Sequence, residues 1–191
     1  MELQAEFNPD KFVVSGPHMV GQEGYAASYC DQLHQKFPSI KKVLEIGVQR
    51  GGSLKLWEKL FDAKVIGVDI DPACAAYGDG INRHVYIGSQ TDVEFLTRDV
   101  VPHAPFDLII DDGGHWSNQQ IISFNTLWPH LASKGIYLIE DLGTTYVFPN
   151  NYGCMQFLKD LVDSIDPQSG AKDLGVESIH FYRGLCWLHK K

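Results

Sequence analysis

The sequence predicts an α/β protein built on a mostly parallel sheet, with helices on both faces and one antiparallel strand near the C-terminus. Two observations support this prediction. Short apolar runs alternate along the chain with segments of helical pattern, and this alternation is typical of parallel strands joined by crossover helices. The last two apolar runs are separated only by Arg183 and Gly184, which is the spacing of a hairpin.

Seven strands and four helices follow from these patterns. Each of the first five strands is an apolar run bounded by turn or charged residues, and the last two strands form the hairpin. The expected strands cover residues 41–47, 63–69, 84–88, 106–112, 135–142, 178–182 and 185–189. The expected helices cover residues 53–61, 91–101, 116–129 and 154–165. Thr91 is the expected N-cap of the second helix, because its hydroxyl can accept a hydrogen bond from the first helical turn.

Residues 1–191 are expected to form a single domain, because this length suits one hydrophobic core. Residues 41–191 make up the predicted core. Residues 1–40 contain a loop-like stretch and an added helix before the first strand. This segment is a candidate lid, with His18 and Tyr25 as the side chains that would close over a ligand.

The composition is that of a folded protein with an acidic surface. Hydrophobic residues make up 44% of the chain and charged residues 21%, which argues against a disordered polypeptide. The formal net charge of −8 would repel a phosphate backbone, so nucleic acid is not an expected partner. No apolar run approaches the ~20 residues of a membrane span, and the acidic N-terminus does not look like a signal peptide. A cytoplasmic protein without a membrane partner is therefore expected.

Four cysteines are spread along the chain without CxxC spacing, namely Cys30, Cys74, Cys154 and Cys186. This spacing argues against a structural zinc site and against a disulfide framework. Reduced thiols, as found in a cytoplasm, are expected instead.

A glycine-rich turn joins the first predicted strand to its helix, in residues 45–53 with the sequence EIGVQRGGS. Gly47 and Gly51 let a ligand approach the backbone closely, near the N–H groups that open the helix. The next strand ends in Asp69, whose carboxylate can bind both hydroxyls of a ribose. The glycines do not match GxGxxG, which disfavours NAD, and Glu45 suits a ligand with an ammonium or sulfonium charge. S-adenosylmethionine is therefore the favoured cofactor.

Carboxylates follow the fourth and fifth predicted strands. Asp112 comes at the end of one strand, and Glu140 and Asp141 come at the end of the other. If these strands are neighbours, the three carboxylates meet in one cleft, where like charges require a proton or a cation between them. Oxygen ligands suit Mg²⁺, Mn²⁺ or Ca²⁺ better than zinc, and Mg²⁺ is the preferred candidate.

His115 follows Asp112 after a tight turn through two glycines. A divalent cation lowers the pKa of a bound oxygen acid, and an imidazole, whose unperturbed pKa is ~6.5, can then take the proton. His115 is therefore the candidate general base for a hydroxyl that attacks the sulfonium methyl. Helix capping by Asp111 or Asp112, and a structural role for His115, are the alternative interpretations.

Several of these motifs together resemble a known family. The segments VLEIGVQRGGSLKLW, VIGVDIDP, IGSQTD, FDLIIDDGGH and GIYLIEDL look like those of class I S-adenosylmethionine-dependent methyltransferases. Within that family the chain resembles the metal-dependent sugar O-methyltransferases of macrolide biosynthesis, of the mycinamicin and macrocin type. The resemblance covers residues 41–146 well and implies a Rossmann-like sheet of seven strands.

The resemblance also implies roles for individual residues. The residues assigned to the cofactor are Glu45, Gly47, Gly51, Ser53, Asp69, Ser89, Gln90, Asp92 and Asp111. The residues assigned to the metal are Asp112, Glu140 and Asp141, with His115 and Asp112 as the catalytic pair. For Gln90 and Asp92, ordinary helix-start chemistry is an equally weighted alternative.

The sequence thus predicts an S-adenosylmethionine-dependent, Mg²⁺-assisted O-methyltransferase that acts on a small-molecule hydroxyl, such as that of a glycosylated antibiotic. The alternatives are an S-adenosylmethionine-binding module without turnover and, third, an NAD-dependent oxidoreductase. Strand edges, aromatic residues and the resemblance favour a homo-oligomer, either a dimer or a tetramer. Four aromatic residues are assigned either to an acceptor pocket or to the core, namely Trp116, Tyr146, Phe148 and Tyr152.

Overall fold

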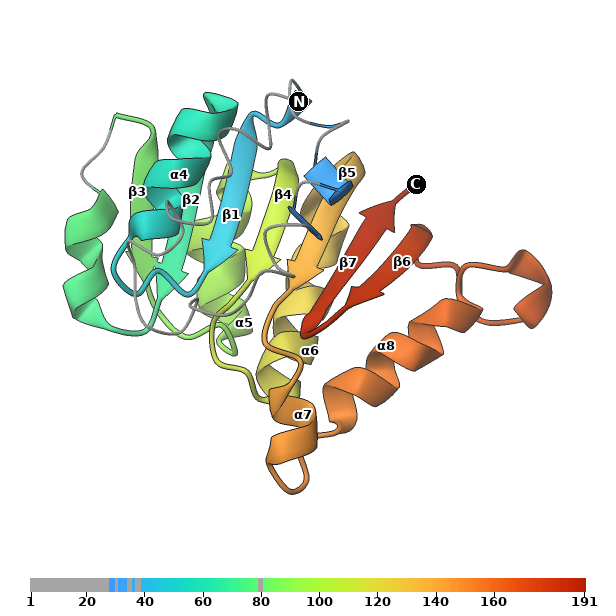
Figure 1. Cartoon of the computed structure of the whole chain (residues 1–191). Coiled ribbons are helices and arrows are strands. Elements are labelled where there is room, and N and C mark those ends of the chain that lie inside the picture. Colours follow the sequence, from blue (N-terminus) through green and yellow to red (C-terminus); the bar gives the residue numbers. More distant parts are fainter. Residues whose placement is uncertain (1–27, 30, 34–35, 37–38, 79–80) are drawn as a thin grey trace.

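The chain forms a seven-stranded sheet with helices on both faces (Figure 1). The computed structural model describes residues 28–29, 31–33, 36, 39–78 and 81–191. The expected N-terminal loop and the lid residues His18 and Tyr25 lie outside the described residues. Part of the expected N-terminal helix is seen, because residues 28–29 and 31–33 are helical.

The strand order across the sheet is β3-β2-β1-β4-β5-β7-β6. The strands are β1 (Lys42–Ile46), β2 (Lys64–Asp69), β3 (Arg83–Ile87), β4 (Phe106–Asp111), β5 (Leu131–Ile139), β6 (Val176–Tyr182) and β7 (Leu185–Lys190). Strands β1 to β5 pair in parallel, whereas β7 runs antiparallel to both β5 and β6. The predicted architecture, a mostly parallel sheet of seven strands with one antiparallel strand from a terminal hairpin, is confirmed.

Two apolar layers attach the helices to the two faces of the sheet. The helices are α4 (Gly52–Phe61), α5 (Val93–Phe95), α6 (Ser117–Leu127), α7 (Thr144–Val147) and α8 (Gly153–Asp163). One core cluster joins the sheet to residues of α5, α6 and α8, including Phe95, Phe124 and Leu158. The other joins the opposite face to α4 and the N-terminal helical residues through Leu54, Trp57 and Tyr29. The burial of both faces explains why the central strands are continuous apolar runs.

Two predicted helices are shorter than expected. Asp92, not Thr91, caps the second helix, because its Oδ1 accepts a hydrogen bond of 3.0 Å from the backbone N–H of Phe95. That helix has one α-helical turn and continues as a π turn and a 3₁₀ turn. The helix expected to reach Pro129 ends at Leu127, and a 3₁₀ turn that contains the proline follows it. Proline lacks the N–H that a continuing α-helix would use.

Three strands end side by side at the carboxyl edge of the sheet. Ile46 of β1 pairs with Asp111 of β4, which pairs in turn with Ile139 of β5. The backbone continues this order beyond the strands, because the N–H of Asp112 donates to Ile46 and the N–H of Glu140 donates to Asp111. The register therefore brings the residues that follow β1, β4 and β5 into one place.

Candidate active site

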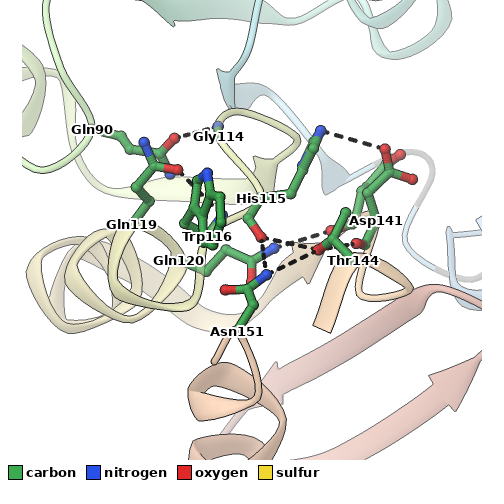
Figure 2. Close-up of polar contacts among 10 residues, drawn as sticks. Gln90, Gly114, His115, Trp116, Gln119, Gln120, Asp141, Thr144 and Asn151 are labelled. Atoms are coloured by element: carbon green, nitrogen blue, oxygen red, sulfur yellow. Dashed lines mark hydrogen bonds and ion pairs between the residues drawn. The ribbon is translucent and has the colours of Figure 1, made fainter. Parts of the chain in front are cut away.

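Two carboxylates and one imidazole meet at the ends of β4 and β5. Ligand atoms of Asp112, His115 and Asp141 all lie within 4.8 Å of one another. His115 Nε2 lies 3.4 Å from Asp141 Oδ2, and the side chain of His115 is 32% exposed, which leaves it accessible to a substrate (Figure 2). Asp141 has a left-handed backbone with φ 53°. Such strain in a residue other than glycine is characteristic of functional sites.

Glu140 lies deeper than these three residues. It is 6% exposed, and the hydroxyl of Tyr29 donates a hydrogen bond to its Oε1. The side-chain amide of Gln120 donates to the backbone oxygen of Glu140 at 3.2 Å. Glu140 is thus buried, and it is not among the residues whose ligand atoms meet within 4.8 Å.

Burial and nearby negative charges raise the pKa of two of these carboxyl groups, Asp112 and Glu140. Burial is the largest cause that raises the pKa of Asp112 well above its usual range, followed by the charges of Glu140 and Asp141. Burial raises the pKa of Glu140 to about 7, against the opposing hydrogen bond from Tyr29. A group of buried acids with raised pKa values is electrostatically incomplete, and a bound cation would complete it.

The donor set fits a hard divalent cation. Carboxylate oxygens and one imidazole nitrogen are ligands that Mg²⁺ or Mn²⁺ accepts, with water and substrate filling the remaining positions. His115 Nδ1 is buried and has no hydrogen-bond partner among the described residues. His115 is placed to act either as a base or as a ligand, since one of its ring nitrogens lies within 4.8 Å of carboxylate oxygens of both Asp112 and Asp141.

The glycine turn after β1 packs directly against the end of β4. Gly47 has φ +93°, and a Cβ built there would lie 2.0 Å from the backbone oxygen of Asp112. Only glycine fits this position, since that distance is impossible for a real side chain. The turn closes through Gly51, whose left-handed backbone precedes the first residue of α4. The predicted cofactor turn and the predicted metal ligand are therefore in backbone contact.

Asp69 supports this turn from the end of β2. Its Oδ2 accepts hydrogen bonds from the backbone N–H groups of Val48 at 2.8 Å and Gln49 at 3.0 Å, and its Oδ1 accepts one from Asp71 at 2.9 Å. Burial raises the pKa of Asp69, but the backbone donors outweigh it and leave the pKa below the usual value. Asp69 is thus a stable anion beside the turn.

Glu45 is buried beneath the turn. Trp57 Nε1 donates to its Oε2 at 3.1 Å. Burial raises the pKa of Glu45 to about 8, the hydrogen bond from Ser53 opposes this rise, and the charge of Glu140 adds to it. Glu45 and Ser53 therefore contact each other on the cofactor side, and the negative charge of Glu140 disfavours the ionised form of Glu45.

Four other residues assigned to the cofactor have internal hydrogen-bond partners. Gln90 and Asp111 are buried and bonded to each other, with Gln90 Nε2 donating to Asp111 Oδ1 at 3.0 Å. A contact between Gln90 and an adenine would therefore have to come from its backbone. Burial raises the pKa of Asp111 to about 7, against opposing hydrogen bonds, the first of which comes from Gln90. Ser89 contacts the hydroxyl of Thr91 at 2.9 Å, and Asp92 is the helix cap described above.

Three residues near the site were not predicted from the sequence. Asn151 is 1% exposed and bonds to the backbone of His115 and Ser117. Tyr29 reaches Glu140 from the N-terminal helical segment, and Thr144 donates to the backbone oxygen of His115 at 3.0 Å. All three are common polar residues in segments without a motif, so the sequence carried no local signal for them.

Exposed aromatic residues surround the acidic side of the site. The aromatic surface consists of Trp116, Tyr146, Phe148 and Tyr152. Trp116 is 50% exposed and Phe148 is 48% exposed, and their ring centroids lie 5.5 Å apart. The rings of Tyr146 and Tyr152 form a second pair at 6.0 Å. Their exposure argues against the alternative that these residues belong to the core.

The described residues include three cysteines and no long apolar helix. Cys74, Cys154 and Cys186 are buried, free thiols. Across residues 28–191, apart from the positions not described, no helix is both long and apolar enough to cross a membrane.

Curated relatives are sugar O-methyltransferases of antibiotic pathways. The chain is 35% identical to the 8-demethyl-8-(2-methoxy-alpha-L-rhamnosyl)-tetracenomycin-C 3'-O-methyltransferase of Streptomyces olivaceus, over 78% of this chain and 44% of the relative. It is 32% identical to the mycinamicin VI 2''-O-methyltransferase of Micromonospora griseorubida, over 95% of this chain and 53% of the relative. The chain thus spans about half the length of the curated relatives it matches.

Solved methyltransferase structures share the fold. The MycE methyltransferase of the mycinamycin pathway, solved in complex with Mg and SAH, superposes with a TM-score of 0.80 at 28% identity. The superposition covers 99% of this chain and 53% of that one. A caffeoyl-CoA O-methyltransferase-like protein from Staphylococcus aureus shares the fold, with a TM-score of 0.63 at 16% identity over 84% of this chain and 81% of that one.

A family of methyltransferase domains matches residues 44–142, which is more than half of the chain. This segment contains the glycine turn, Asp69, Asp112, His115 and both acids after β5. The resemblance predicted from the motifs is confirmed, and the chain belongs to the methyltransferase domain family.

Proposed function

We propose that this protein is an S-adenosylmethionine-dependent, divalent-metal-assisted O-methyltransferase that acts on a hydroxyl of a sugar in a glycosylated natural product. One observation carries the proposal. Asp112, His115 and Asp141 meet within 4.8 Å, and the Asp112 backbone contacts Gly47 of the glycine turn. A methyl donor bound at that turn would lie beside a site suited to activating a hydroxyl.

The cofactor half of the site uses the turn after β1. Gly47, Gly51 and Ser53 would hold the methionine part, Asp69 would bind the ribose hydroxyls, and the carboxylate of Glu45 would favour the positive charges of the cofactor. S-adenosylmethionine, when bound, supplies the sulfonium methyl that the acceptor oxygen attacks. The glycine spacing offers no place for a diphosphate, which keeps NAD the weaker candidate.

The metal half uses the ends of β4 and β5. Asp112 and Asp141 would be the direct ligands, with Glu140 either a third ligand or the buried charge behind them. Mg²⁺, when bound, offsets these negative charges and lowers the pKa of the acceptor hydroxyl. Burial and the neighbouring carboxylates raise the pKa of Asp112 and Glu140, and a bound cation would favour their charged forms.

His115 would act as the general base. Its Nε2 faces Asp141 at 3.4 Å, so the imidazolium formed on taking the hydroxyl proton would be stabilised by a carboxylate. The partial exposure of His115 lets an acceptor reach it, and its backbone oxygen accepts hydrogen bonds from the side chains of Thr144 and Asn151 (Figure 2).

The acceptor class is proposed from the relatives and from the aromatic surface. The named relatives act on sugars attached to tetracenomycin or to a macrolide. Trp116 follows His115 directly and pairs with Phe148, so an apolar aglycone could lie on these rings while its sugar enters the site. We further propose a homo-oligomeric enzyme of the cytoplasm, with a small-molecule acceptor and with no nucleic-acid or membrane partner.

The test is methyl transfer from S-adenosylmethionine to a panel of glycosylated macrolides and aromatic polyketides. We expect transfer with Mg²⁺, its loss in EDTA, and its return when Mg²⁺ is added in excess. Full activity in EDTA would remove the metal from the proposal. Tight cofactor binding without transfer to any acceptor would favour the alternative of a binding module without turnover.

A further inference from the structure

The turn between β4 and α6 carries the reactive groups, and side chains outside the predicted catalytic set hold it in place. Residues 113–117 follow Asp112, include His115 and lead into α6. Glycines at 113 and 114 make the backbone intrinsically adaptable. The position of His115 relative to Asp112 therefore depends on contacts that the turn receives from elsewhere.

Gln90 holds the turn from the loop after β3. Its Oε1 accepts a hydrogen bond of 2.6 Å from the backbone N–H of Gly114 (Figure 2). Its Nε2 donates to Asp111 Oδ1 at 3.0 Å and to Ser123 Oγ at 2.9 Å. The N–H of Gly114 can only donate and the carboxylate of Asp111 accepts, so a flipped amide would lose both of these bonds, and the orientation of the amide is fixed.

The space around Gln90 matches this role. A Cβ built at Gly113 would lie 2.4 Å from Gln90 Oε1. The turn therefore comes close enough for its backbone to bond with the amide only because residue 113 has no side chain. The glycine and the glutamine form one complementary pair, although 22 intervening positions separate them in the sequence.

Asn151 holds the same turn from the opposite side. Its Oδ1 accepts a hydrogen bond of 2.7 Å from the N–H of Ser117, and its Nδ2 donates to the backbone oxygen of His115 at 3.0 Å. Asn151 is buried although it lies between two exposed aromatic residues, Phe148 and Tyr152. The segment that presents the aromatic surface is thus bonded directly to the backbone of His115.

We infer that Gln90 and Asn151 are positioning residues, which fix the turn carrying Asp112 and His115 relative to the cofactor side and to the acceptor side. The inference rests on the proposed function for its catalytic consequence. Gln90 links the turn to the loop after β3, and Asn151 links it to the aromatic surface. A base fixed from both sides keeps the same distance to the methyl donor and to the acceptor, which methyl transfer requires.

The test compares the unmodified protein with Gln90→Met and Asn151→Leu, which keep side-chain volume approximately and remove the amide. Ser123→Ala is the matched control, because it removes a buried partner of Gln90 without touching the turn. Three quantities are measured for each protein at a temperature where it is folded. Amide hydrogen exchange is measured without metal. The affinities for Mn²⁺ and for S-adenosylhomocysteine are measured by calorimetry.

We expect the amide of Gly114 to exchange at least tenfold faster in Gln90→Met, and the amide of Ser117 to do so in Asn151→Leu. Mn²⁺ affinity should fall by ~10–100-fold in both, the usual cost of losing a group that orients a metal ligand. S-adenosylhomocysteine affinity should stay within about threefold of that of the unmodified protein, since neither side chain faces the glycine turn. Ser123→Ala should leave all three quantities near their original values.

Three results would overturn the inference. Unchanged exchange at Gly114 and Ser117 would mean that the amides do not hold the turn. Unchanged Mn²⁺ affinity would mean that the metal site does not depend on the position of the turn. An equal loss of Mn²⁺ and S-adenosylhomocysteine affinity would indicate a general structural role. If the unmodified protein binds neither Mn²⁺ nor S-adenosylhomocysteine, the proposed function fails, and the inference is then judged on the exchange alone.

Discussion

The two halves of the site are built in different ways. The turn after β1 is made by the backbone, with left-handed glycines and with N–H groups bonded to an anionic Asp69. The acidic cluster, consisting of Asp112, Glu140 and Asp141, is made of side chains, and burial together with the neighbouring charges raises the pKa of Asp112 and Glu140. The first half is electrostatically satisfied without a ligand, and the second is not. The comparison teaches that a cation, as proposed, would act on the acidic cluster and not on the glycine turn.

The largest effect is expected where the chemistry takes place. His115→Ala should lower kcat by ~10²–10⁴-fold, the usual cost of removing a general base. Affinity for S-adenosylmethionine should stay within about threefold, because His115 lies in the acidic half and not on the glycine turn. Single-turnover rates with calorimetry of the same samples measure both quantities, and a fully active His115→Ala would show that the base is another group.

A smaller effect on binding is expected at the metal ligands. Asp112→Ala should weaken Mn²⁺ by more than tenfold, since even the loss of a group that supports a ligand costs ~10–100-fold. S-adenosylhomocysteine should bind as before, because the atoms nearest to Gly47 are backbone atoms of Asp112 and Gly113, not the carboxylate of Asp112. The matched control is Asp107→Ala, whose carboxylate bonds the N–H groups of Lys41 and Lys42 at the far end of the sheet. Equal losses of Mn²⁺ affinity in the two variants would contradict a local metal site.

The smallest effect is expected in the way the free energy of unfolding changes with pH. The pKa of Glu45 is raised to about 8 in the folded protein, so the folded state holds a proton that the unfolded chain releases above pH ~4.5. In EDTA the free energy of unfolding contributed by Glu45 should therefore fall as pH rises from about 4.5 to 8. Asp69 has a lowered pKa, and its contribution should instead be lost only as pH falls below about 4.

The difference between the unmodified protein and Glu45→Gln isolates this contribution. His103 and His189 have lowered pKa values and give the opposite slope, but they act equally in both proteins. Each kcal/mol of difference corresponds to ~2–4 °C in Tm for a domain of this size. Glu45→Gln should be the more stable protein at pH 8 and should lose that advantage by pH 5. If the difference in Tm between the two proteins stays constant from pH 5 to pH 8, the carboxyl of Glu45 is not protonated in the folded protein.

Features that depend on local pattern were predictable from the sequence. The five parallel strands and the hairpin follow from apolar runs and from the residues that bound them, and the register places Asp112 and Glu140 together because both follow strands that end side by side. The glycine turn was recognisable because its conformation demands glycine at position 47. These signals lie within a few residues of the feature that they predict.

Features that depend on distant partners were not predictable. Thr91 and Asp92 are both good capping residues, and only the course of the chain after β3 decides that Asp92 is used. Gln90 was assigned to the cofactor from the family resemblance, whereas its side chain turns inward to Asp111 and Gly114. Asn151 bonds to a turn more than 30 residues away, and nothing in its own neighbourhood indicates that partner.

The most direct test of the account is a calorimetric titration of S-adenosylmethionine into the purified protein, with Mg²⁺ and again in EDTA. If the two halves are built as described, micromolar binding should appear in both conditions, because the glycine turn is complete without a cation. A separate titration of Mn²⁺ should then show binding to the acidic cluster. Absence of S-adenosylmethionine binding in both conditions would contradict the central claim, and NAD would be the next ligand to titrate.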